Sequence, residues 1–156
     1  AQKNFEGFMP LGAPAADVVA RCHKAMAEYE AIMHKAELHS VMTLMDDFIR
    51  WAQKHWADGI KAAEGADDAD MRRQILVDSF FTLRVATLLM HPVAPEGCEK
   101  IVEHLALPPE RVFSWNAPFE GMAELCDAAD VEACRHAIVE LPPRTDFFAK
   151  HESQFK

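Results

Sequence analysis

The chain has 156 residues, of which 50% are hydrophobic and 26% are charged, and its formal net charge at pH 7 is −9. This composition is typical of one globular domain, excludes an intrinsically disordered chain, and argues against a general nucleic-acid binder, which needs excess Lys and Arg to neutralise phosphates. No apolar run approaches the roughly 18 residues of a membrane span, so we expect a cytoplasmic protein without a membrane partner.

The first part of the chain predicts an extended segment followed by a helix. Residues 1–14 contain two glycines and two prolines, which interrupt helices, and we expect Phe5 and Phe8 in this segment to cover the end of a bundle. Hydrophobic residues then recur at steps of three and four over residues 15–34, which predicts a helix. The following turn at residues 35–36 is short, so this helix and the next should lie antiparallel.

A long amphipathic helix, predicted over residues 37–65, is the element around which the chain is organised. At about 100° per residue its apolar side chains fall on one broad side, which is typical of a helix packed into a core. These apolar residues are Val41, Met42, Met45, Phe48, Ile49, Ala52, Trp56, Ile60 and Ala63. The basic residues Arg50, Lys54 and Lys61 fall together on the opposite side. Gly65 is expected to supply the left-handed residue that ends the helix.

Two further helices complete the predicted bundle. Aspartates within residues 67–70 suit the start of a third helix. Apolar residues lie on nearly every side of this helix, and the His-Pro pair at residues 91–92 ends it. Pro95 suits the first residue of a fourth helix. Its inward-facing residues are Cys98, Ile101, Val102 and Leu105. We therefore predict an all-α fold, an antiparallel helical bundle over residues 1–107.

Residues 108–156 predict an irregular extension that packs on the bundle or on a neighbouring domain. Three prolines over residues 108–121 interrupt regular structure. The expected apolar anchors of this segment are Val112, Phe113, Trp115 and Phe119. A short helix is predicted over residues 130–140, since its apolar residues recur at helical spacing, and the prolines at residues 142–143 end it. The remaining residues, 144–156, predict an extended tail.

The sequence contains no pattern typical of a catalytic or metal site. A carboxylate-bridged bundle needs Glu-x-x-His pairs, and the Glu and His residues of this chain are spaced differently. Cys126, Cys134 and His136 lack the spacing of structural zinc ligands, and four cysteines without a CxxC pair indicate buried thiols. Glycine-rich phosphate loops and GxSxG elbows are also absent from the sequence. We expect no catalytic residue, metal or cofactor in this chain.

The two tryptophans of the central helix are candidates for binding RNA. An indole offers a flat surface to an unstacked base, and a nearby cation can hold the adjoining phosphate. Trp56 lies within the apolar side of the helix, so periodicity favours a core position for it, and Trp51 lies at the margin of that side. Arg50, Lys54 and Lys61 are equally consistent with a solvated face.

Three stretches carry a resemblance to a known family. They are KNFEGFMP, SVMTLMDDFIRWAQKHWADGIK and LRVATLLMHPVAPEGCEKIVEHLAL. In their order and in the P-x-x-P break they resemble the helical anticodon-binding domain of class I aminoacyl-tRNA synthetases, most closely that of methionyl-tRNA synthetase. The C-terminal LPPRTDFFAKHESQF also looks like the end of some members. The resemblance implies binding of the anticodon loop of tRNA, CAU for methionine, beside a catalytic domain that uses ATP and can carry zinc.

The resemblance also assigns roles to individual residues. In the methionine enzymes an Asn-x-Tyr-Ile-like stretch precedes Pro-Trp, and that tryptophan stacks on the anticodon. Here residues 46–49 and the pair His55-Trp56 occupy these places, with His55 for the proline and with one additional residue of spacing, which turns a helical side chain by about 100°. The stacking role is carried to Trp56, with Trp51 as second candidate. The expected tRNA-binding residues are Asp46, Arg50, Trp51, Lys54, His55, Trp56 and Lys61.

Several parts of such an enzyme are not in this sequence. The catalytic domain, with its HIGH-like and KMSKS-like motifs, and a helix with other anticodon-reading residues are missing. We therefore expect a C-terminal piece of a longer synthetase, with a free-standing relative as the alternative. The helix–HPxxP–helix element is shared with synthetases for other apolar amino acids, so the anticodon-binding domain of one of those enzymes is also consistent with the sequence. A helical protein-interaction module without RNA, favoured by the acidic charge, and a metal-containing bundle are two further hypotheses. We expect no DNA partner.

Overall fold

The computed structural model describes residues 7–115, 120–128 and 135–138 of the chain, with Arg135 described by its backbone alone. Some sequence predictions concern residues outside this set. They are those for Phe5, for Phe119, for residues 130–134 and 139–140 of the predicted short helix, which include Cys134, and for residues 142–156, which include the two prolines and the extended tail.

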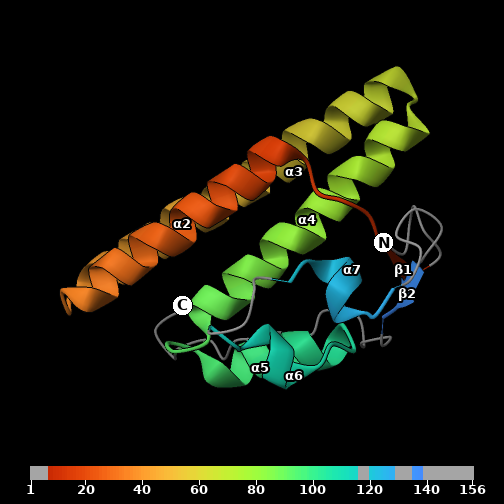
Figure 1. Cartoon of the computed structure of the whole chain (residues 1–156). Helices are drawn as coiled ribbons and strands as arrows, with labels where there is room; N and C mark the ends of the chain where they lie inside the picture. The colour runs from red at the N-terminus through yellow and green to blue at the C-terminus, as the bar shows by residue number, and fades with distance from the viewer. Residues whose placement is uncertain (1–6, 116–119, 129–134, 139–156) are drawn as a thin grey trace, which may run out of the picture.

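Three long helices lie side by side and form most of the fold (Figure 1). They are α2 (Ala16–His34), α3 (Leu38–Ala66) and α4 (Ala69–Met90). Short turns join them, so consecutive helices run in opposite directions. The most extensive helix contact is between α3 and α4, which together project beyond α2 (Figure 1). These helices begin and end close to the predicted positions, and the all-α bundle predicted from the sequence is confirmed.

The end of α3 differs from the prediction. The left-handed residue is Asp67, with φ 50° and ψ 38°, whereas Gly65 stays within the helix. An aspartate tolerates this conformation because its short side chain is polar and can bond locally. The next residue, Asp68, caps α4, because its carboxylate accepts the backbone N–H of Met71 at 2.9 Å. Two consecutive aspartates therefore reverse the chain between α3 and α4.

Two apolar clusters form the interior. The first lies among α2, α3 and α4, and its buried residues are Val18, Cys22, Ala25, Tyr29, Val41, Leu44, Met45, Phe48, Phe81, Val85 and Leu89. The second lies at the end of the bundle, and its buried residues are Met9, Leu11, Val102, Leu105, Leu107, Val112, Met122 and Leu125. The second cluster brings the N-terminal segment together with residues that follow α4.

Three shorter helices follow α4. They are α5 (Pro95–His104), α6 (Pro109–Val112) and α7 (Met122–Leu125). Pro95 begins α5 as predicted, and Cys98 and Val102 are fully buried, since each is at most 1% exposed. Arg111 in α6 donates to both carboxylate oxygens of Glu120, at 3.1 and 2.8 Å, and so joins α6 to the segment that leads to α7.

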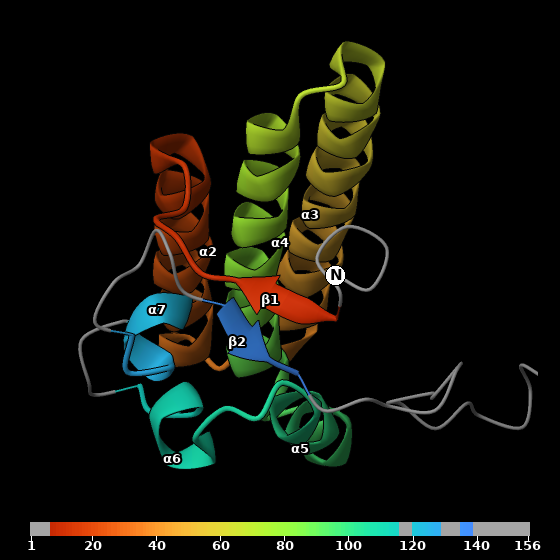
Figure 2. The ribbon, with the colours of Figure 1, turned by 90° about the vertical axis from the view of Figure 1, so that its right-hand side faces the viewer.

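A small two-stranded sheet includes residues 135–137, which lie within the segment predicted as a helix over residues 130–140. β1 (Phe8–Pro10) pairs antiparallel with β2 (Arg135–Ala137), with Met9 opposite His136, and Figure 2 shows the pair in front of α4. His136 also lies 2.8 Å from the carbonyl of Leu105 through Nε2. The extended N-terminal segment thus offers a pairing edge that overrides the helical spacing of residues 135–137. Phe8, predicted to cover the end of the bundle, is 36% exposed, whereas its neighbour Met9 is fully buried and belongs to the second apolar cluster.

Candidate nucleic-acid interface on α3

Trp51 is partly buried and packs against the apolar cluster where α3 meets α2. Its ring centroid lies 5.6 Å from that of Phe48 and 5.7 Å from that of His55, on which it stacks at 26°. The guanidinium carbon of Arg21, on α2, lies 5.4 Å from the same indole centroid. A cation at that distance over an aromatic face is attracted by the ring electrons. The indole of Trp51 therefore contacts side chains of α2 and α3 within the fold.

His55 lies beside a buried carboxylate of α4. The Asp78 side chain is 2% exposed, and its Oδ2 lies 3.6 Å from Nε2 of His55, which is too long for a hydrogen bond. Its other oxygen, Oδ1, accepts the backbone N–H of Ala15 at 2.8 Å and the amide of Gln74 at 3.0 Å. Asp78 thus fixes the start of α2 against α4, and His55 is part of the same polar cluster.

The predicted cations lie on the exposed side of α3. The Nε of Arg50 lies 2.7 Å from Asp46, and the Nζ of Lys54 lies 3.1 Å from Asp58, each one turn away along the helix. The hydrogen bond to Asp46 raises the pKa of Arg50 above its usual value. Lys61 is also exposed. Exposed pairs of this kind contribute little to stability because water screens them, so a phosphate can compete for these cations.

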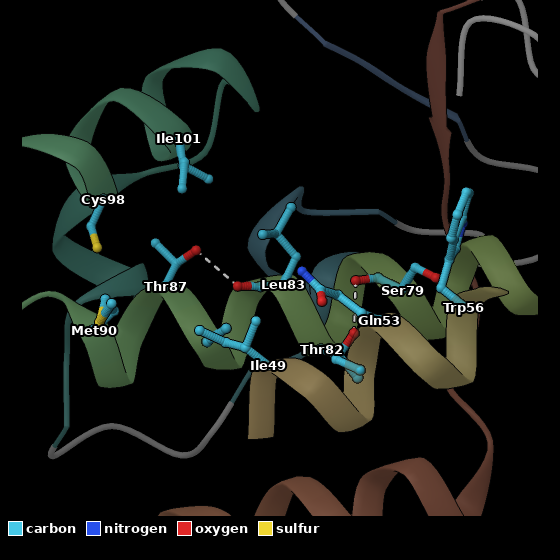
Figure 3. Close-up of a pocket in the computed structure, with 12 residues that line it drawn as sticks. Ile49, Gln53, Trp56, Ser79, Thr82, Leu83, Thr87, Met90, Cys98 and Ile101 are labelled. Carbon is cyan, nitrogen blue, oxygen red and sulfur yellow. Dashed lines mark hydrogen bonds between the residues drawn. The ribbon is translucent and has the colours of Figure 1, made fainter. Parts of the chain in front are cut away.

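Trp56 lies at one end of a groove between α3, α4 and α5 (Figure 3). It is 46% exposed, so it does not occupy the core position that periodicity favours. The groove has a volume of about 330 Å³, and α5 closes the end opposite Trp56. Its lining residues are Ile49, Ala52, Gln53, Trp56, Ser79, Thr82, Leu83, Ala86, Thr87, Met90, Cys98 and Ile101. Small residues on the facing sides of α3 and α4 leave this space open.

The reactive side chains of the groove are already occupied or protonated. The hydroxyls of Ser79, Thr82 and Thr87 donate to backbone carbonyls one turn earlier in α4, at 2.6, 2.9 and 2.8 Å. Burial raises the pKa of the Cys98 thiol to about 11, so it is neutral at pH 7 and a poor nucleophile. The groove is thus built for contact with an apolar or aromatic group.

The structure separates the predicted residues into three places. Trp51 and His55 face α2 and α4, the charged residues lie on the exposed side, and Trp56 lies at the groove. The two tryptophans are five positions apart, which corresponds to about 140° around the helix. Gln53, which was not among the predicted site residues, lines the groove one turn before Trp56. Its spacing of three residues from Trp56 is the signal that places both on one side of a helix.

Metal ligands do not gather in the described parts of the chain. Among these residues, no group of three or more His, Cys, Asp or Glu side chains could hold a metal ion. Burial raises the pKa of Cys126 to about 11, and His136 faces a backbone carbonyl. Within the same residues, no helix is both long and apolar enough to cross a membrane.

Comparison with known proteins identifies solved structures of the same fold. No protein-family model and no curated protein sequence matches the chain. Mycobacterium tuberculosis methionyl-tRNA synthetase bound by methionyl-adenylate matches 94% of this chain at 22% identity, with a TM-score of 0.56. Its apo form matches 96% at 23% identity, with a TM-score of 0.53. This chain spans 28% and 29% of the lengths of those two chains. At this identity the match shows the fold, and the chain has the fold of a part of that synthetase.

Proposed function

We propose that this chain is the anticodon-binding part of a methionine-tRNA ligase that acts in the cytoplasm. The observation that carries the proposal is the exposed Trp56 indole at the end of an open groove, in a fold found in methionyl-tRNA synthetase. Stacking of an unpaired base on an aromatic side chain contributes about 1–3 kcal/mol per base. An exposed tryptophan can supply that energy without disturbing the core.

The arrangement supports a positioning role. A base splayed from the anticodon loop, CAU in methionine tRNAs, stacks on Trp56, and the neighbouring phosphates lie near Arg50, Lys54 or Lys61 on the exposed side of α3. Holding the loop in this way places the acceptor end of the tRNA at a separate catalytic domain, which uses ATP and can carry zinc. The acidic net charge limits non-specific RNA affinity, so stacking supplies much of the binding energy.

The direct test is a fluorescence titration at low salt with an RNA hairpin that carries the CAU anticodon loop. We expect the hairpin to quench the indole emission of the wild-type chain. Trp56→Ala should weaken binding about 5- to 150-fold, which is the equivalent of one stacked base. Trp51→Phe and Trp115→Phe are matched controls, and both should retain the quench. Binding by Trp56→Ala at wild-type affinity would refute the proposal.

A second test uses a protein in which this chain is joined to its catalytic domain. Trp56→Ala should raise the KM for tRNA in aminoacylation and leave methionine activation, measured by ATP–pyrophosphate exchange, unchanged. Equal losses in both reactions would indicate a damaged fold instead of a lost tRNA contact.

A protein-interaction role is the second candidate. Met33, Leu38 and Met42 are 40%, 64% and 46% exposed, and they lie around the turn between α2 and α3. Exposed apolar side chains close together are typical of a protein interface. Hairpins with CAU and with an altered anticodon distinguish the two candidates, since only an anticodon-binding domain prefers CAU.

A further inference from the structure

Gln53 presents a side-chain amide at the groove beside Trp56. It is exposed, and Figure 3 shows it between Ile49 and Trp56 along α3, with its amide turned towards α4. Residues three apart on a helix are neighbours, with their Cβ atoms about 5–6 Å apart. The amide is therefore within reach of the edge of a flat ring that lies on the Trp56 indole.

Gln53 has hydrogen-bonding capacity that the other polar residues of the groove lack. The three hydroxyl groups of the lining donate within α4, and the Trp56 indole offers a donor only. An amide offers two N–H donors and one carbonyl acceptor together, and in the described parts of the chain this amide has no hydrogen-bond partner. Such a pair matches the donor–acceptor edge of a nucleobase.

The size and charge of the site indicate one base as the occupant. A volume of about 330 Å³ is at the lower end of the range for ligand pockets, about 300–1,000 Å³, which suits a single ring system. The cations next to the groove residues, Arg50 and Lys54, are paired with carboxylates of their own helix. Recognition inside the groove thus depends on stacking and neutral hydrogen bonds.

We propose that Gln53 recognises the edge of the base that stacks on Trp56, donating one N–H and accepting one hydrogen bond through its carbonyl. This inference rests on the proposed function, since it requires an RNA base at Trp56. In this role Gln53 determines specificity, because its amide forms hydrogen bonds only with a base that has a complementary edge. Stacking alone binds any base.

The test combines a substitution of Gln53 with removal of one base from the anticodon loop of the hairpin. Three hairpins, each lacking one of the three anticodon bases, identify the stacked base as the one whose absence abolishes the Trp56 quench. Gln53→Leu should weaken binding of the intact hairpin about 5- to 150-fold and should cause no further weakening with the hairpin that lacks that base. Gln53→Glu keeps the acceptor but loses the donors, so it should also bind the intact hairpin less tightly.

The controls separate this inference from the proposed function. Thr43→Val is an exposed change about 15 Å earlier on α3 and should bind both hairpins as wild type does. Thermal unfolding of each variant checks that the fold is intact. If Gln53→Leu and Gln53→Glu bind like wild type while the quench persists, the role of Gln53 is overturned and stacking on Trp56 stands. Equal weakening with and without the stacked base also overturns it, and a wild-type chain that binds no hairpin overturns both proposals.

Discussion

Two glycines of α3 provide a test of how closely α3 and α4 pack. A Cβ added at Gly59 would lie 2.8 Å from Cγ1 of Ile75 on α4, and still closer to the terminal methyl of that side chain. A Cβ added at Gly65, in the last turn of the same helix, would meet open space. The same substitution by alanine therefore meets a close neighbour at Gly59 and open space at Gly65.

The magnitudes follow from two opposing effects. Alanine within a helix stabilises the fold by about 0.5–1 kcal/mol relative to glycine, because glycine loses more backbone freedom on folding. Forcing an extra methyl group into a packed interface costs about 1–3 kcal/mol. Gly65→Ala should raise the free energy of unfolding by up to about 1 kcal/mol, since only the first effect applies. Gly59→Ala should leave it unchanged or lower it by up to about 2 kcal/mol, since both effects apply.

Urea unfolding followed by circular dichroism measures both variants. The predicted quantity is the difference between them, about 1–3 kcal/mol in favour of Gly65→Ala. Ile75→Val removes the closest methyl group, so the double variant with Gly59→Ala should recover part of the loss in a double-mutant cycle. Equal stability of the two alanine variants would refute the close approach of α3 to α4 at Gly59.

Three further predictions concern stability and are measured by urea unfolding. Trp51→Ala should cost about 3 kcal/mol because it removes packing against the core, whereas Trp56→Ala should cost about 1 kcal/mol or less. Asp78→Ala should cost about 1–3 kcal/mol because it leaves the partly buried donors of Ala15 and Gln74 unpaired. Burial raises the pKa of Cys22 from 9.0 to about 12, so its contribution to stability is complete below pH 9 and falls as the pH rises towards 12. Cys22→Ala should make stability less sensitive to pH in that range.

The long helices could be predicted because their signals are local. Hydrophobic spacing defined residues 15–34, and the pair at residues 91–92 together with Pro95 placed the break between α4 and α5. The αL residue at the end of α3 was misplaced because glycine is the usual residue there, although Asp67 takes the position. The side chain of Asp68 caps α4 and so holds the turn, and within this turn Asp67 takes the αL conformation in place of a glycine.

The strand at residues 135–137 could not be predicted from the sequence, because its partner is more than a hundred residues away. Its apolar spacing fits a helix, and only the pairing of Met9 with His136 gives these residues their extended form. Long-range pairing of this kind depends on which edge the rest of the fold leaves free. The pairing at β1 and the contact of His136 with Leu105 both come from parts of the chain distant from this strand.

The different positions of Trp51 and Trp56 have the same origin. A helical periodicity gives one mean direction for the apolar side, but α3 has neighbours in two directions, with α2 beside Trp51 and α5 beyond the groove from Trp56. Whether an apolar residue is buried then depends on how far each neighbour extends along α3. The α5 helix closes only the far end of the groove, so Trp56 remains open to a ligand while Trp51, nearer the centre of the apolar contacts with α2, is packed. The residue with the more apolar helical position is thus the one available for binding, because burial on α3 is decided by the lengths and placement of its partners.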